Sequence, residues 1–234
     1  MSHHVTRRTA LLGSLAALLA SCGDDEAAQR KAFAAFLQGR ILDKPGVHVA
    51  RPTPEEAKSW GEYAKHYSVI TGFNDELSQR VSKPMQEAVQ RGAVRSIDDL
   101  LTRRADLLAV RSGMKELGAE LDRQFEAAEA ARAALTQPAD LKAVYDAAYE
   151  RDVAGPARAF KEVFPVTDAS FAATLDLGDF IAGHRSAVQV QGATVQVADP
   201  ALLREFNARL ATMQTAASSA QAAQRRLQAI ITGS

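Results

Sequence analysis

Cys22 is the only cysteine of the chain, and the residues before it indicate what its thiol can do. It ends the sequence Leu-Ala-Ser-Cys at positions 19–22, which closes an apolar run that begins at Ala10 behind Arg7 and Arg8. A basic start, a short apolar middle and small residues before a cleavage point are the parts of a secretory signal. With a cysteine directly after the cleavage point, the pattern is a lipobox. The thiol of Cys22 can then carry a diacylglycerol, and its freed amine can carry a third acyl chain.

This pattern predicts a protein tethered to a membrane surface. The apolar run is too short to span a bilayer, which takes about 20 apolar residues, whereas several acyl chains together anchor a protein far more firmly than one. We therefore predict that residues 1–21 are a lipoprotein signal peptide and that residues 22–234 form a single helical periplasmic domain, with lipid attachment at Cys22. Gly23 permits sorting to the outer membrane, with the domain on its periplasmic face, and Asp24 leaves retention in the inner membrane open.

No other segment of the sequence carries a recognisable catalytic or metal-binding pattern. His48, His66 and His184 are far apart and lack the helical spacing of metal ligands. Ser112 and Lys115 match the Ser-x-x-Lys spacing of penicillin-binding enzymes, but the Ser-Asp-Asn and Lys-Thr-Gly sequences that accompany it there are absent. We predict no catalytic residue, no metal ligand and no cofactor. The protein is expected not to be an enzyme, and a hydrolase is the remaining alternative.

The charged residues favour neither a catalytic pair nor a nucleic-acid partner. Glu55 with Glu56, and Asp98 with Asp99, fall in the first turn of predicted helices, where acidic side chains compensate the helix dipole. The chain has 28 basic and 28 acidic residues, and removal of the signal leaves a small acidic excess. Because nucleic-acid binding relies on a basic surface, we expect no nucleic acid among the partners.

Hydrophobic periodicity predicts that long helices form most of the domain. Residues 24–42 show an apolar stripe at helical spacing. Another helix is predicted behind Thr53 and Pro54, because the threonine can cap it and the proline suits its first position. Residues 96–136 form a further predicted helix, which Ser96 can cap. Its apolar residues repeat every seven positions, which is typical of packing against a comparable helix. The helix that begins after Asp199 is the predicted partner of that segment.

The remaining stretches are predicted to form shorter elements. Prolines and glycines divide residues 137–183 into short helices that make a lid or corner, and Pro84 is expected to kink or restart the helix before it. Residues 187–198 alternate valine with polar residues on both sides of Gly192 and Ala193, which predicts a β-hairpin with its valines on one face. A turn at these two residues pairs Val190 with Val195 and Val188 with Val197. A free hairpin is marginal in water, so its valine face should pack on the helices.

Several short segments occur in an order that is typical of a known group. They are residues 29–33 (Gln-Arg-Lys-Ala-Phe), 36–38 (Phe-Leu-Gln), 67–72, 140–142 (Asp-Leu-Lys) and the valine hairpin. Together they resemble the YiaF-like enterobacterial lipoprotein family, a domain of unknown function, and the similarity runs from the lipobox nearly to the C-terminus. The resemblance implies a lipid-anchored envelope protein. Only the lipid-bearing role of Cys22 carries over from it.

These features predict a mainly α fold, an elongated helical bundle with long antiparallel helices, several short helices and one β-hairpin at about residues 187–198. The expected role is structural or that of an adaptor, in which the long helices offer contact surface to an envelope protein partner. The membrane is reached through the N-terminal lipid. The alternative is a periplasmic module that binds a lipid or a small apolar ligand between its helices near Trp60, Tyr63 and Tyr67.

Overall fold

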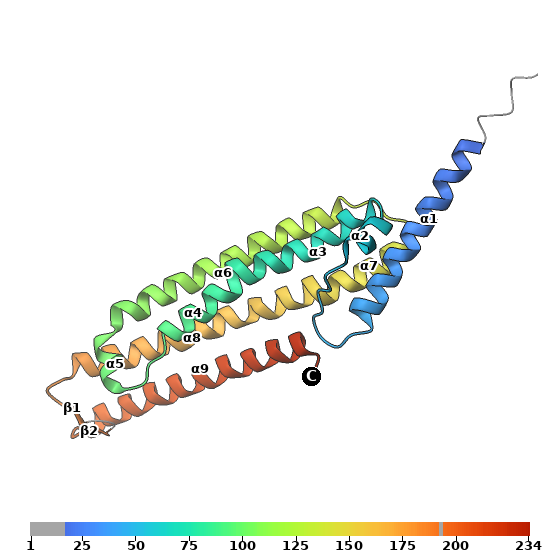
Figure 1. Cartoon of the computed structure of the whole chain (residues 1–234). Coiled ribbons are helices and arrows are strands. Elements are labelled where there is room, and N and C mark those ends of the chain that lie inside the picture. The colour runs from blue at the N-terminus through green and yellow to red at the C-terminus, as the bar shows by residue number, and fades with distance from the viewer. Residues whose placement is uncertain (1–16, 192–193) are drawn as a thin grey trace, which may run out of the picture.

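The computed structural model describes residues 17–191 and 194–234, which form an elongated assembly of helices (Figure 1). Residues 1–16 of the predicted signal peptide and the predicted turn at 192–193 lie outside the described residues. The mainly α fold with long helices and one hairpin is confirmed. The α-helices are α1 (Ala17–Leu37), α2 (Pro54–Ser59), α3 (Tyr63–Leu77), α4 (Lys83–Arg91), α5 (Ile97–Thr102), α6 (Arg104–Ala133), α7 (Ala139–Tyr149), α8 (Gly155–Gly183) and α9 (Pro200–Thr232).

Helical turns of π type extend or join some of these helices. They are η1 (Gln38–Leu42), η2 (Ser78–Ser82) and η3 (Glu150–Ala154). Two of them directly precede a helix that has a proline in its first turn, Pro84 in α4 and Pro156 in α8. A proline cannot donate to the carbonyl four residues earlier, so the hydrogen-bond ladder has to change ahead of it. The predicted restart of the helix near Pro84 is therefore seen as the passage from η2 to α4.

Residues 137–183 differ from the prediction of separate short helices. Here α7, η3 and α8 follow one another without a loop, and Pro165 lies inside α8. The α8 helix has buried side chains along its whole length, because it packs against α6 on one side and α9 on the other. This burial outweighs the local helix-breaking tendency of proline and glycine, which is a weak predictor when tertiary contacts are extensive.

The two capped helix starts are confirmed. Thr53 accepts the backbone N–H of Glu56 at 3.1 Å, and the Glu56 carboxylate accepts that of Thr53 at 2.7 Å. This reciprocal pair is a capping box, with Pro54 at the start of the helix. Ser96 accepts the backbone N–H of Asp99 at 3.0 Å and so starts α5.

The helix predicted over residues 96–136 is divided in two at Arg103, between α5 and α6. The guanidinium of Arg103 turns back and donates to the carbonyl of Ala93 at 3.0 Å and to the carbonyl of Arg91. Arg91 is the last residue of α4 and Ala93 follows it, so these carbonyls lie where helical donors are lacking. The seven-residue repeat does not reveal this break, since Leu100 and Leu107 are buried on either side of it.

The hairpin forms with the predicted register. Strand β1 (Val188–Gln191) pairs antiparallel with β2 (Thr194–Val197), and Val188 lies opposite Val197 while Val190 lies opposite Val195. The valines contact the helices as part of one apolar cluster, whereas the glutamines are exposed. The face assignment is therefore confirmed.

The last helix, α9, packs mainly on α8 and not on α6, so the predicted pairing of α9 with the segment at 96–136 is wrong. The α6 helix packs instead against α3, α4 and α8. The apolar side chains divide into a large core between α1, α3, α6, α7 and α8 and a smaller cluster near the hairpin. Within residues 17–191 and 194–234, no helix is long and apolar enough to cross a bilayer.

Candidate functional site

The predicted lipid-attachment residue, Cys22, lies near the start of α1, the helix that projects from the body of the bundle (Figure 1). Residues 25–28 after it are exposed, and Phe33 is the first α1 side chain from there on that is fully buried. Tyr63 donates a hydrogen bond to the Glu26 carboxylate, so the contacts of α1 with α3 begin one turn beyond the cysteine. Acyl chains on Cys22 would thus be joined to one end of the molecule.

The aromatic side chains near the predicted ligand site pack on one another. The Phe36 and Phe33 rings lie 4.5 Å and 5.2 Å from the Trp60 ring, measured between centroids. Trp60, Tyr63 and Tyr67 are only 2%, 7% and 3% exposed. A groove of about 420 Å³ runs beside Trp60 and Tyr67 at the surface. These rings therefore belong to the main core, and ligand binding near them stays a prediction.

A buried polar centre lies in the π-helical turn η3. Asp152 is fully buried, and its Oδ1 accepts the backbone N–H of His48 at 3.0 Å. The backbone carbonyl of Asp152 lacks its α-helical donor because residue 156 is proline, and the Asn74 side chain donates to it at 2.9 Å instead. Oδ2 has no hydrogen-bond partner among the described residues. Burial raises the pKa of Asp152 to about 6, against the opposing effects of the His48 bond and of Arg151.

The same centre fastens the segment between α1 and α2. Arg151 donates from Nε to the carbonyl of Gly46 at 2.9 Å and from Nη1 to that of Leu42 at 2.7 Å. The Tyr67 hydroxyl donates to the carbonyl of Ala50 at 2.5 Å, and burial raises its pKa. These donors are directed at backbone carbonyls of residues 42–50. The arrangement therefore holds a loop against α3 and η3, and its task is structural.

The three histidines singled out in the sequence lie apart. The His66 ring Nδ1 is 2.9 Å from Nε2 of Gln137, and burial lowers the pKa of this histidine. The His184 ring Nδ1 is 2.9 Å from the carbonyl of Phe180. The contact of His48 is made by its backbone N–H, which donates to Asp152. Throughout the described part of the chain, no group of three His, Cys, Asp or Glu side chains could hold a metal ion.

The Ser-x-x-Lys pair and the acidic pairs are on the surface. Ser112 and Lys115 are both exposed on α6, next to the buried Met114. Glu56 and Asp99 are engaged in starting α2 and α5. These positions have the surroundings expected of helix surfaces and caps.

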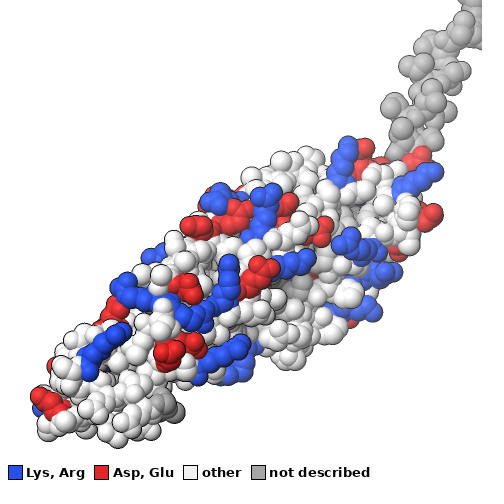
Figure 2. Space-filling model, turned by 60° about the vertical axis from the view of Figure 1, so that its left-hand side comes forward, with Lys and Arg blue, Asp and Glu red and all other residues white. Residues whose placement is uncertain are grey.

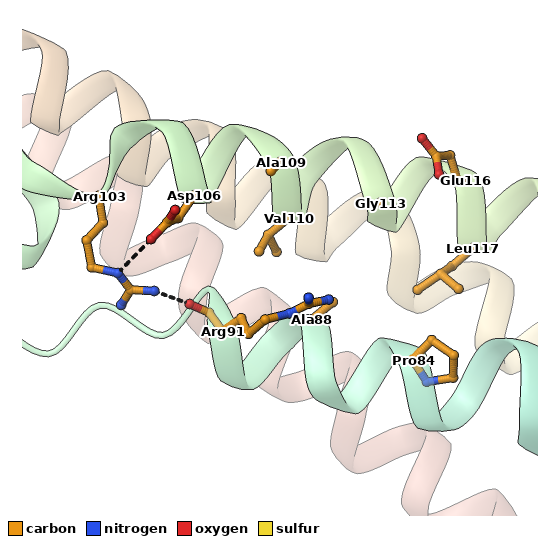
Figure 3. A pocket seen from close by; sticks show the side chains of 10 residues that line it. All are labelled: Pro84, Ala88, Arg91, Arg103, Asp106, Ala109, Val110, Gly113, Glu116 and Leu117. Atoms are coloured by element: carbon orange, nitrogen blue, oxygen red, sulfur yellow. Dashed lines mark hydrogen bonds and ion pairs between the residues drawn. The ribbon is translucent and has the colours of Figure 1, made fainter.

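A groove of about 460 Å³ lies between α4 and α6 (Figure 3). Its floor consists of small and apolar residues such as Ala88, Val110 and Gly113. At one end Arg103 pairs with Asp106 at 3.4 Å while its guanidinium also holds the end of α4. Arg103, one of the two arginines that line this groove, thus already stabilises the fold.

A larger and more apolar hollow, of about 560 Å³, lies at the end of the molecule that carries the hairpin, far from α1 (Figure 1). Two polar residues, Arg95 and Ser96, lie on its lining. A volume of this size falls within the range of small-molecule sites. The apolar lining residues come from the segment after α4 and from α5, α8, β2 and α9: Val94, Ile97, Leu100, Leu177, Ile181, Val195, Phe206, Leu210 and Met213.

Comparisons with known proteins agree on one family. The model of a family described as "Protein of unknown function (DUF3053)" matches residues 10–228. "Uncharacterized protein YiaF" of Escherichia coli (strain K12) is 28% identical over 196 residues, which cover 83% of this chain and 83% of that protein, and the proteins of the same name from Escherichia coli O157:H7 and Shigella flexneri match equally. No solved structure matches significantly. The chain therefore belongs to the DUF3053 family of proteins of unknown function.

Proposed function

We propose that the protein is a lipid-anchored lipoprotein of the cell envelope whose helical domain has a structural or adaptor role. The observation that carries the proposal is the lipobox that ends at Cys22. The position of Cys22 in α1, ahead of the exposed residues 25–28 and of the fully buried Phe33, supports it. The family match begins at residue 10 and so includes the apolar run before the cysteine.

The proposed location is the periplasmic face of the outer membrane, with inner-membrane retention as the alternative. The lipid on Cys22 would reach the membrane, and the bundle would extend away from it. The 33 residues of α9 alone span about 50 Å at 1.5 Å per residue. A tether at one end therefore leaves long helix faces available to an envelope protein partner.

An adaptor role is supported by the character of these faces. Among the described residues, the large hydrophobic side chains that remain exposed are Leu108, Leu203 and Ile230, at 41%, 40% and 43%. Figure 2 shows Lys and Arg intermingled with Asp and Glu along the visible face. Most large apolar side chains are thus buried, and partner recognition would rely on polar and charged contacts.

The anchor is tested by Cys22→Ser in cells fed a fatty-acid analogue. We expect the variant to lose the label and either to accumulate as unprocessed precursor or to enter the soluble fraction. Ser21→Ala, which keeps a small residue before the cysteine, is the matched control and should be labelled as the wild type is. Unchanged labelling of Cys22→Ser would overturn the proposal.

The adaptor role is tested by photo-crosslinking in cells from exposed positions of the long helices, such as Ser112 on α6 and Ser218 on α9. We expect a discrete crosslinked envelope protein from at least one helix, and we expect Ser112→Ala to leave the envelope role intact. A hydrolytic activity of the purified protein that Ser112→Ala abolishes, with an unchanged melting temperature, would favour an enzyme instead.

A ligand-binding module is the second candidate, and the apolar hollow near the hairpin favours it.

A further inference from the structure

The hollow at the hairpin end is a groove, open to the surface, beside a small apolar core. Six buried apolar side chains form this cluster, and nine more pack on it while only partly buried. Protein interiors are close-packed and leave few voids larger than a water molecule. The hollow of about 560 Å³ therefore presents apolar surface that a ligand could cover.

The walls of this hollow come from elements that are far apart in the sequence. Leu100 lies on α5, Leu177 on α8, Val195 on β2 and Leu210 on α9. Leu100 and Leu177 are 6% and 3% exposed, whereas Val195 and Leu210 are half-buried. The inner wall is thus well packed, and the side formed by the hairpin and α9 is the more open one.

A positive charge lies on the rim of the hollow. Arg95 is exposed, and only its backbone N–H is engaged, with the Asp99 carboxylate at 2.9 Å. Two other arginines at this end are paired, since Arg104 donates to Asp179 at 2.6 Å and Arg209 lies 3.3 Å from Asp176. Among the residues that the structure describes, the Arg95 guanidinium has no ion-pair partner. Asp99 accepts the backbone N–H of Arg95 and forms no ion pair with its guanidinium, which is therefore available to an added anion.

We propose that this hollow binds a long-chain fatty acid, with the hydrocarbon chain among the apolar side chains of α5, α8, β2 and α9 and the carboxylate on Arg95. An arginine fork matches the two oxygens of a carboxylate, and a charge-assisted bond of this kind is strong. Nine apolar residues and a single cation on the lining match one apolar chain with one anionic end. The inference goes beyond the adaptor role and does not depend on lipid attachment at Cys22.

A bound chain should also order the hairpin. Val195 contributes to the wall of the hollow, and a two-stranded hairpin is only marginally stable without such packing. Binding that fills the hollow would therefore favour the closed hairpin over its locally open states. We expect palmitate to slow amide hydrogen exchange at residues 194–197 of the wild-type protein.

The direct test uses the full-length protein in lipid nanodiscs, with a palmitate analogue that carries a diazirine and an alkyne. After photolysis, mass spectrometry identifies the labelled peptides. We expect saturable labelling of peptides that contain residues 94–100 or 206–213, reduced by unlabelled palmitate. Labelling of α1 near the bilayer would be non-saturable and is distinguished by position. Absence of saturable labelling at the hollow would overturn the proposal.

Two substitutions fill the hollow and a third is their control. Leu210→Trp and Met213→Trp add volume at the lining, whereas Leu203→Trp adds it on the exposed side of the same helix. We expect the two filling variants to bind the probe about tenfold more weakly, so that labelling at the hollow falls by about that factor. Labelling of the control should stay unchanged. Equal labelling in all three would refute the site. If both filling variants unfold, hydrogen exchange of the wild type decides, and unchanged exchange at 194–197 would refute it.

The carboxylate assignment is tested with Arg95→Gln. Arg204→Gln is the control, because Arg204 is exposed on α9 outside the lining. We expect Arg95→Gln to weaken labelling by the acid probe several-fold and to leave labelling by the corresponding fatty-alcohol probe unchanged. An equal response of both probes, or of both variants, would contradict the role of Arg95.

Discussion

The stability of the protein should depend on pH through Asp152, and Asp152→Asn isolates that dependence. The carboxyl is fully buried in η3, and its Oδ1 accepts the His48 backbone N–H at 3.0 Å. Oδ2 has no partner within the described residues. An asparagine keeps an oxygen for the His48 bond but cannot ionise. The substitution therefore removes the charge while it keeps the shape of the side chain.

The magnitude follows from the pKa of Asp152, which burial raises from 3.8 to about 6. Each pKa unit corresponds to about 1.4 kcal/mol, so ionising this group costs about 3 kcal/mol more in the folded protein than in the unfolded chain. Because the folded-state pKa is the higher one, the stabilising contribution is complete below about pH 4 and is lost as the pH rises through about 6. Between these limits the wild type should lose about 3 kcal/mol relative to the asparagine variant.

The assay is urea unfolding followed by circular dichroism, from about pH 4 to about pH 7, with both proteins compared at each pH. Other groups titrate in both proteins, so their contributions to the pH dependence of stability cancel in this comparison. The new amide group costs the variant about 1–3 kcal/mol if it lacks a partner, but this cost is the same at every pH. Parallel stability curves would refute the reasoning, since Asp152 would then ionise as it does in the unfolded chain.

Further substitutions test the hairpin, the loop at Gly46 and the end of α4. Val190→Asp places a charge under the hairpin and should lower the free energy of unfolding by about 2–3 kcal/mol. Its control, Gln189→Asp on the exposed face, should change that free energy by less than about 0.5 kcal/mol. Equal shifts of the melting temperature would contradict the face assignment. Gly46→Ala should cost about 2–4 kcal/mol, because Gly46 has a φ of +66° and an added Cβ would meet the backbone at the end of α9. Gly72→Ala, which adds its Cβ in open space on α3, should instead stabilise by about 0.5–1 kcal/mol. Arg103→Met should lower stability by about 1–3 kcal/mol and speed hydrogen exchange in the last turn of α4, and unchanged exchange there would refute its capping role.

Features set by neighbouring residues were predictable from the sequence. The capping box at Thr53 and the start of α5 at Ser96 depend on side chains three positions away from the amides they serve. The register of the hairpin follows from alternation across a two-residue turn. The lipid-attachment prediction at Cys22 is likewise local, because it rests on a short continuous motif.

Features set by distant contacts were not predictable. The apolar stripe of α9 is compatible with several partners, and only the three-dimensional path of α7 and α8 places α8 against it. The break at Arg103 depends on carbonyls at the end of another helix. The polar centre at Asp152 had one signal, an aspartate four positions before Pro156, but its donor Asn74 lies 78 residues away. The hollow near the hairpin has no local signal, since separate elements meet to form it.

The central claim is that the protein is anchored through Cys22, and the mass of the mature N-terminus tests it most directly. Protein purified from membranes is digested with trypsin, and the peptide of residues 22–30 is sought by mass spectrometry. The account predicts that this peptide begins at Cys22 and carries a diacylglycerol on the thiol together with an amide-linked acyl chain, and that peptides from residues 1–21 are missing. A mature chain that retains residues 1–21, or that carries an unmodified Cys22, would contradict the account.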